Sequence, residues 1–238
     1  MATADPITPP PARRAGRTPR TWTPAEFAAL VALPAFAGRP LALSGGTVVE
    51  HRPDGPRPLR FTRAEYEAIY SRFCHRQRVR LIRGVLVQEP PMNPPHATAL
   101  YKTTKALERA FPAGHVVRAQ LPLNLDPFSR PHPDVAVAAG SFEDYAAEHP
   151  TTAVLVVEVA DDTLFQDTTE QAELYASAGI ADYWVVDIPN RRLRVFRDPA
   201  PIPDGGAAYR DDRAYAPGET VAPLAAPAAA VPVADLLP

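Results

Sequence analysis

The segment AVLVVEVADD, residues 153–162, decides the fold of this chain. It is aliphatic from Ala153 to Val157 and then carries a carboxylate at Glu158, before Val159 and Ala160. A continuous aliphatic run of this length predicts a strand that is covered on both faces of its sheet. An isolated buried charge is costly unless a partner or a metal offsets it. Glu158 therefore either lies just past the buried part of the strand or has a cation beside it.

The segments on both sides of this strand predict further strands and helices. A helix is expected over residues 96–111 and another over residues 167–179, ending at Gly179 as its C-cap. Strands are expected on both sides of the central one, at residues 115–123, 131–140, 182–188 and 191–198. This order predicts an α/β (α+β) fold with a mixed sheet flanked by helices.

Residues 22–50 resemble residues 61–89 at a shift of 39, without a gap. Each copy contains a Thr-x-x-Glu sequence, beginning at Thr23 and at Thr62, which predicts a capping box at the start of a helix. A strand, a glycine and a second strand follow, which predicts a hairpin. We interpret the two segments as a duplicated helix–hairpin module. Chance similarity between two capped amphipathic helices is the alternative.

Composition limits the classes of function. The chain has 238 residues and a formal net charge of −2, which counts against tight nonspecific binding of nucleic acid by the whole surface. The single cysteine, Cys74, excludes an intramolecular disulfide and agrees with a reducing compartment. The sequence shows no secretory signal and no run near the roughly 18 apolar residues of a membrane helix. We therefore expect a cytoplasmic protein with no membrane partner.

The distribution of proline suggests boundaries in the chain. Many of its 30 prolines lie in the first 24 residues and in the part after Pro199. We expect a disordered Pro/Arg-rich tail whose arginines are solvated rather than bound to phosphates: Arg13, Arg14, Arg17 and Arg20. The expected division is the tail at 1–20, a helix–hairpin at 21–59 that duplicates 60–89, a main domain at 60–198, and a Pro/Ala-rich extension at 199–238.

Two acids are candidates for chemistry, Asp134 and Glu158, because each sits on a strand dominated by aliphatic residues. If the strands are neighbours, the carboxylates lie close together, and their repulsion at about 4 Å is about 4 kcal/mol at a dielectric near 20. A hard cation such as Mg²⁺ removes that penalty and prefers such oxygen ligands. A metal placed there can assist attack on a phosphoryl group. The alternative is that both acids face solvent at strand ends.

Four stretches resemble the Uma-type restriction endonuclease family, which belongs to the PD-(D/E)XK nuclease superfamily. They are RLIRGVLVQEPPMNPPHATAL (80–100), PDVAV (133–137), VVEVADDTLFQD (156–167) and ELYASAGIADYWVVD (173–187). The resemblance extends from about residue 62 to residue 198. It implies a restriction-endonuclease-like fold for the main domain, Mg²⁺ or Mn²⁺ as cofactor, and DNA as partner.

Carried over by position, the resemblance implies that Asp134 and Glu158 are metal ligands, joined by the backbone carbonyl of Val159. The lysine typical of the family lies four residues after an aspartate, here Asp167, and its place is taken by Gln171. Glutamine can orient water, but it supplies no positive charge. Loss of one such electrostatic element typically lowers the rate by roughly 10²–10³.

Other departures concern the hairpin that precedes the long helix. The family tends to carry two acids there, where this chain has Arg80 and Arg83. These arginines either bind the scissile phosphate or pair with Asp134 and displace the metal. His96 matches a histidine that is frequent in the family, and it either caps the helix or contacts the substrate.

Three functions follow as hypotheses. The first is a metal-dependent endonuclease acting on DNA, in which Asp134, Glu158 and Gln171 are the catalytic residues. The second is a catalytically inactive relative that binds nucleic acid or a protein partner. The third is a structural homodimer, supported only by the edge strands that the extra hairpin offers.

Overall fold

A mixed six-stranded sheet forms the centre of the computed structural model, which describes residues 17–74, 78–203 and 205–238. The strand order is β12-β11-β10-β9-β8-β7, and β9 lies inside the sheet, parallel to β10 and antiparallel to β8. The predicted mixed sheet is confirmed. Its strands are β7 (His115–Ala119), β8 (Val135–Ala139), β9 (Leu155–Ala160), β10 (Asp182–Asp187), β11 (Arg192–Pro201) and β12 (Ala207–Tyr215).

Helices cover both faces of this sheet. On one face α3 (Pro94–Ala110) packs through Leu107 against alternate residues of β9, among them Val157. On the other face α5 (Glu170–Ser177) packs through Tyr175 against Val156. Because side chains alternate along a strand, Glu158 faces α5. None of the helices in the described ranges is long and apolar enough to cross a membrane.

The helix expected over residues 167–179 is broken and begins earlier. It consists of α4 (Leu164–Thr168) and α5, separated at Thr169, where φ is −124° and ψ is −80°. The Thr168 hydroxyl donates to the Leu164 carbonyl at 2.8 Å and the Thr169 hydroxyl donates to the Phe165 carbonyl at 2.6 Å. Such back-bonding by threonine competes with the helix ladder and bends helices. Gly179, with φ of 73°, ends the second part as predicted.

The C-terminal part belongs to the main sheet and its core. The expected boundary at residue 198 lies within β11, and β12 pairs with β11 along its length. Beyond β13 (Thr220–Val221) and β14 (Val231–Pro232), three aliphatic side chains of the last turn are buried in the cluster beneath α3: Val233, Leu236 and Leu237. The chain is therefore not divided at residue 198, since β11 continues to Pro201 and pairs with β12.

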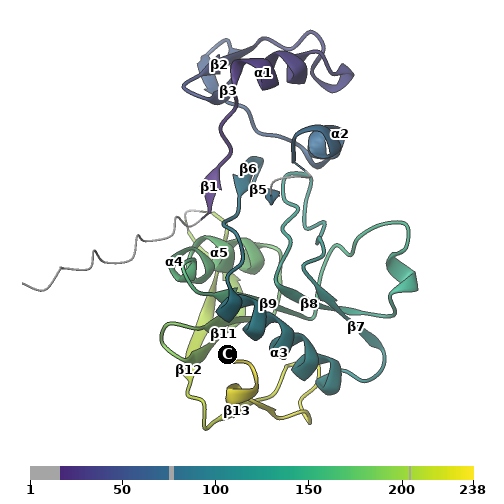
Figure 1. Ribbon diagram of the computed structural model, residues 1–238, viewed down its shortest axis with the longest axis vertical. Coiled ribbons are helices and arrows are strands. Elements are labelled where there is room, and N and C mark those ends of the chain that lie inside the picture. Colours follow the sequence, from purple (N-terminus) through teal and green to yellow (C-terminus); the bar gives the residue numbers. More distant parts are fainter. Residues whose placement is uncertain (1–16, 75–77, 204) are drawn as a thin grey trace, which may run out of the picture.

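Two helix–hairpin units lie on the N-terminal side of the main sheet. Their elements are α1 (Pro24–Val31), β2 (Leu41–Ser44), β3 (Thr47–Arg52) and β4 (Gly55–Pro58), then α2 (Arg63–Ile69), the π-helical turn Tyr70–Cys74, β5 (Val79–Ile82) and β6 (Val85–Gln88). Both predicted capping boxes are present, at Thr23 and at Thr62, with nearly identical backbone angles. Figure 1 shows α1, β2 and β3 at the top, far from α3.

The two helix–hairpin units align with each other when one gap is placed between the helix and the hairpin turn. The Trp22 amide donates to the Gly46 carbonyl at 2.8 Å, and the Phe61 amide donates to the Gly84 carbonyl at 2.8 Å. The helices therefore match at a shift of 39 residues and the hairpin turns at a shift of 38, so the ungapped alignment is wrong in the hairpins. The rings of Trp22 and Phe61 stack with centroids 6.1 Å apart, which places the two units against each other.

In each unit, the strand that precedes the helix pairs with the hairpin of the other unit. β4, which precedes α2, pairs with β3 of the first hairpin, and β1 (Thr18–Pro19), which precedes α1, pairs with β6 of the second. The pairing of Thr18 with Gln88 places Arg17 opposite Glu89, and in Figure 1 β1 lies between the upper units and the main sheet. Arg17 and Arg20 are thus not part of a solvated tail, whereas Arg13, Arg14 and the rest of residues 1–16 lie outside the described residues.

Candidate active site

Asp134 and Glu158 lie side by side, as the sequence predicts for neighbouring strands. The pairing of Val135 with Val157 sets Asp134 opposite Glu158. The Asp134 amide donates to Glu158 Oε2 at 3.3 Å, and the Val159 amide donates to Asp134 Oδ2 at 2.9 Å. Both side chains are buried, so the alternative of two solvent-facing acids is wrong. Their role as metal ligands, with the Val159 carbonyl, stays a prediction.

Asp134 is held in its ionised form by a histidine. His96 Nε2 lies 3.2 Å from Asp134 Oδ1, and Gln120 Nε2 donates to the same oxygen at 3.2 Å. Burial raises the pKa of Asp134, but the hydrogen bond and charge of His96, helped by Arg80, outweigh burial and hold that pKa below its ordinary value. Burial lowers the pKa of His96, and Asp134 reverses this effect, so the net pKa of His96 is raised.

Glu158 lies within the buried part of its strand and has both a donor and a cation beside it. The Tyr175 hydroxyl donates to Glu158 Oε1 at 2.8 Å. Burial raises the pKa of Glu158 well above its usual value; Arg17 acts against this, while the charges of Asp134 and Asp167 add to it. Burial and the neighbouring acids therefore disfavour the ionised form of Glu158, and Arg17 opposes this effect.

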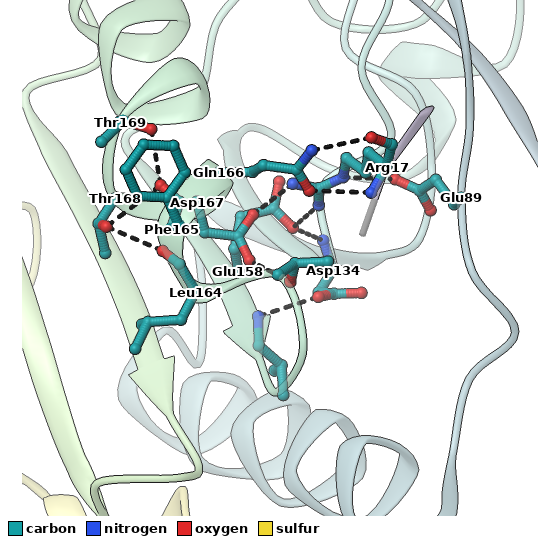
Figure 2. A network of polar contacts seen from close by, with 12 residues as sticks. Arg17, Glu89, Asp134, Glu158, Leu164, Phe165, Gln166, Asp167, Thr168 and Thr169 are labelled. Carbon is teal, nitrogen blue, oxygen red and sulfur yellow. Dashed lines mark hydrogen bonds and ion pairs between the residues drawn. The ribbon is translucent and has the colours of Figure 1, made fainter. Parts of the chain in front are cut away.

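The cation beside Glu158 is Arg17 (Figure 2). The prediction that Arg17 lies in a solvated tail is wrong. Its guanidinium contacts Glu89 Oε1 at 3.1 Å through Nε and Glu158 Oε2 at 3.7 Å through Nη2, and it donates to Asp167 Oδ1 through Nη1. Burial lowers the pKa of Arg17, but the three carboxylates outweigh burial and raise it, so the guanidinium stays charged.

Asp167 completes what we call the acidic centre, defined as Glu89, Asp134, Glu158 and Asp167. It is fully buried at the end of α4, and its Oδ2 accepts a hydrogen bond from the Thr163 hydroxyl at 2.5 Å. Burial raises the pKa of Asp167, and Arg17 and Thr163 offset part of this shift. In the sequence, Asp167 stands out only as the aspartate four residues before the lysine position, and no local pattern points to Glu89.

Comparison with known proteins places this arrangement in a family. Residues 63–234 match the profile of the Uma2 family, which is described as "Putative restriction endonuclease". The chain belongs to the Uma2 family. The match begins at the first residue of α2, so it includes the second hairpin and the main sheet but neither α1 nor Arg17. None of the curated proteins matches the chain.

A solved structure has the same fold as this Uma2 chain. It is described as a "putative nuclease belonging to DUF820" from Anabaena variabilis. The two share 13% sequence identity with a TM-score of 0.50, over 66% of this chain and 88% of that one. At this identity the likeness shows the fold alone, and it agrees with the restriction-endonuclease-like architecture that the sequence predicts.

Gln171, which stands in the lysine position, is buried one helical turn before Tyr175. Residues four apart share a helix face, so Gln171 lies on the side of α5 from which Tyr175 reaches Glu158. Within the described residues its Oε1 has no hydrogen-bond partner. An unsatisfied buried carbonyl is an acceptor available to a bound water. The predicted water-orienting role of Gln171 is compatible with this position.

Arg80 and Arg83, which stand in the hairpin where the resemblance predicts acids, have different surroundings. Arg80 contacts Glu89 Oε2 at 2.5 Å and donates to the His132 carbonyl, and its side chain is only 7% exposed. Arg83 lies at the hairpin turn and contacts Glu173 Oε1 at 3.0 Å, with its side chain 42% exposed. Arg83 is therefore accessible to a substrate phosphate, whereas Arg80 fixes Glu89.

The acidic centre suits a hard cation by chemistry, because its donors are carboxylate oxygens. In this arrangement, however, protein groups already contact both oxygens of Asp134 and both oxygens of Glu158. No set of three or more His, Cys, Asp or Glu side chains within the described ranges is placed to hold one metal ion. With Arg17 in place, the centre fits a guanidinium rather than a divalent metal.

Proposed function

We propose that this Uma2 chain is a metal-dependent endonuclease that hydrolyses phosphodiester bonds in DNA. The observation that carries the proposal is the buried pair of Asp134 and Glu158, which face each other on neighbouring strands of a restriction-endonuclease-like sheet. The family description and the nuclease described for the similar structure support the same function. DNA as substrate and Mg²⁺ or Mn²⁺ as cofactor are part of the proposal.

The chain's residues divide the work as follows. Asp134 and Glu158, with the Val159 carbonyl, would hold the metal, which when bound polarises a phosphoryl oxygen and lowers the pKa of water. The Val159 amide fixes Asp134, and the Tyr175 hydroxyl fixes Glu158. Gln171 would orient the attacking water.

Two further side chains would meet the substrate. Arg83, which is partly exposed at the hairpin turn, and His96, whose pKa is raised by Asp134, would contact phosphate. We expect the reaction to occur in the cytoplasm, where the buried Cys74 would remain reduced.

A second function is favoured by two specific observations. Gln171 supplies no charge, and Arg17 occupies the acidic centre, so the domain would be a catalytically inactive relative that binds nucleic acid or a protein partner. DNA binding of this kind depends on salt and survives the loss of Asp134. Homodimerisation remains a third proposal without support from a specific contact.

The deciding experiment is incubation of the full chain with supercoiled plasmid in Mg²⁺ and in Mn²⁺. Wild type is compared with Asp134→Asn and with Asp212→Asn, a control in which the same change is made at a partly exposed acid that pairs with Arg194 on the sheet edge. Nicking that is lost in Asp134→Asn and kept in Asp212→Asn supports the endonuclease. Salt-sensitive DNA binding without nicking, unchanged in Asp134→Asn, supports the inactive binder.

A further inference from the structure

Arg17 is a positive charge that a distant part of the chain brings into the acidic centre. It is 150 residues from Asp167 in sequence and lies outside the segment that matches the Uma2 family. Three acids from three elements surround it: Glu89 follows β6, Glu158 lies on β9 and Asp167 on α4. Figure 2 shows the guanidinium between Glu89 and Asp167, close to Glu158.

The backbone of Arg17 is held as firmly as its side chain. Its amide donates to Gln166 Oε1 at 2.8 Å, and Gln166 Nε2 donates to the Arg17 carbonyl at 2.8 Å. Pairing of β1 with β6 and a hydrogen bond from the Arg20 amide to the Leu86 carbonyl at 2.7 Å continue this attachment. These contacts direct the side chain to one place.

The guanidinium is not placed to reach a substrate. Its Nε, Nη1 and Nη2 each contact a carboxylate, and its side chain is 9% exposed. An arginine that stabilises a phosphate in the transition state needs donors directed at that phosphate. In Arg17 all three nitrogens are used for carboxylates, and one of these, Glu158, is a ligand of the proposed metal.

We propose that Arg17 is an internal cation that occupies the acidic centre in place of a divalent metal, so that metal binds only when the segment 17–19 withdraws. This inference rests on the proposed metal site, but it does not depend on cleavage of DNA. A guanidinium carries one charge and a divalent metal two, and both need the Glu158 carboxylate, whose Oε2 lies 3.7 Å from Arg17 Nη2. The two occupants therefore exclude each other.

Withdrawal of this segment leaves the hydrophobic core of the N-terminal units intact. β1 has only two residues, and the contacts of Arg17 are polar. The next anchors along the chain are Arg20, whose amide donates to the Leu86 carbonyl, and Trp22, which stacks on Phe61. Residues 17–19 can therefore detach while the helices and hairpins stay folded.

The test is Mn²⁺ binding to the full chain, measured without DNA from the electron paramagnetic resonance signal of free Mn²⁺. Wild type is compared with Arg17→Gln and with Arg39→Gln, a control that removes an arginine paired with Glu50 and Glu65 far from the acidic centre. We expect Arg17→Gln to bind Mn²⁺ at least about tenfold more tightly than wild type. Arg39→Gln should bind like wild type.

Additional variants locate the effect. Arg17→Lys keeps the charge and should bind Mn²⁺ as weakly as wild type. Adding Glu158→Gln to Arg17→Gln should abolish the gain in affinity. Gln166→Ala loosens the backbone attachment without changing a charge, and it should give a smaller gain; it also serves if Arg17→Gln does not fold. The inference is overturned if a folded Arg17→Gln protein binds Mn²⁺ no more tightly than wild type.

The inference and the proposed endonuclease can fail separately. Tight Mn²⁺ binding by Arg17→Gln without plasmid nicking would support the internal cation and contradict the endonuclease. Nicking by wild type that slows in Arg17→Gln, with unchanged Mn²⁺ affinity, would show that Arg17 supplies the charge that Gln171 lacks. That result would overturn the internal cation and keep the endonuclease.

Discussion

Replacement of Arg17 by glutamine should destabilise the metal-free protein and make its stability depend on divalent metal. The guanidinium lies 3.7 Å from Glu158, which at an effective dielectric of 20 corresponds to about 4 kcal/mol of attraction, partly offset by the desolvation of both groups. Glu89 retains Arg80 as a partner, whereas among the described residues the substitution leaves Glu158 and Asp167 without an ion-pair partner. Removing one partner of a buried pair costs about 3–5 kcal/mol, and we expect about 3 because glutamine keeps some hydrogen bonds.

The loss should depend on pH with a definite sign. Burial raises the folded-state pKa of Glu158 and of Asp167, so their ionisation disfavours the folded state as pH rises through the folded pKa. Without Arg17 the folded-state pKa of both carboxyl groups is raised further, so their ionisation disfavours the folded state more strongly. The difference in the free energy of unfolding between wild type and Arg17→Gln should therefore be larger at pH 8 than at pH 5.

Urea unfolding followed by circular dichroism, with and without Mn²⁺, measures these quantities. A metal that binds only the folded state stabilises it by about 2.7 kcal/mol at one hundred times its Kd, so Mn²⁺ should restore most of what Arg17→Gln loses. Wild type and Arg39→Gln should respond little. The reasoning is refuted if metal-free Arg17→Gln is within about 0.5 kcal/mol of wild type, the range of a neutral surface change.

Three further predictions concern separate groups. Gln171→Lys should raise plasmid nicking by roughly 10²-fold when combined with Arg17→Gln and much less on its own; equal gains in both backgrounds would contradict the internal cation. His149, whose pKa is lowered by burial and by nearby arginines, accepts a hydrogen bond from buried Arg118 at 2.9 Å. Its contribution to stability should be present above the unfolded pKa of about 6.5 and decline below it, so urea unfolding between pH 7 and pH 5 should show a smaller loss in His149→Gln than in wild type. Burial raises the pKa of the Cys74 thiol to about 11, so a thiol reagent at pH 7.5 should react far faster in urea than with the native protein; equal rates would show that Cys74 is accessible.

The main sheet could be predicted because its signals are local. The aliphatic run around Glu158 and the strand after Asp134 have the composition of buried strands, and their adjacency in the sheet brings the two acids together. The capping boxes at Thr23 and Thr62 could be identified for the same reason, since all their hydrogen bonds lie within four residues.

The contacts of Arg17 could not be predicted from local patterns. An arginine in a proline-rich stretch is usually solvated, and its partners lie far away in sequence. The sequence does not predict the C-terminal strand β12, because its charged residues and the alanines and prolines around it are not typical of a strand. A chain end rich in proline is expected to be irregular only if no neighbouring strand is available to pair with it.

The pairing of strands between the two helix–hairpin units explains how Arg17 reaches the acidic centre. Without β1, the outer edge of β6 would have unpaired backbone groups, and exposed edges of this kind favour pairing with another strand. The leading strand of the first unit fills that edge, as β4 fills the edge of β3 in the reciprocal position. The pairing of Thr18 with Gln88 then fixes Arg17 opposite Glu89, next to Glu158. The pairing of β1 with β6 thus completes a small sheet and places the charge of Arg17 in the acidic centre. Loss of the first unit together with β1 should therefore expose the acidic centre.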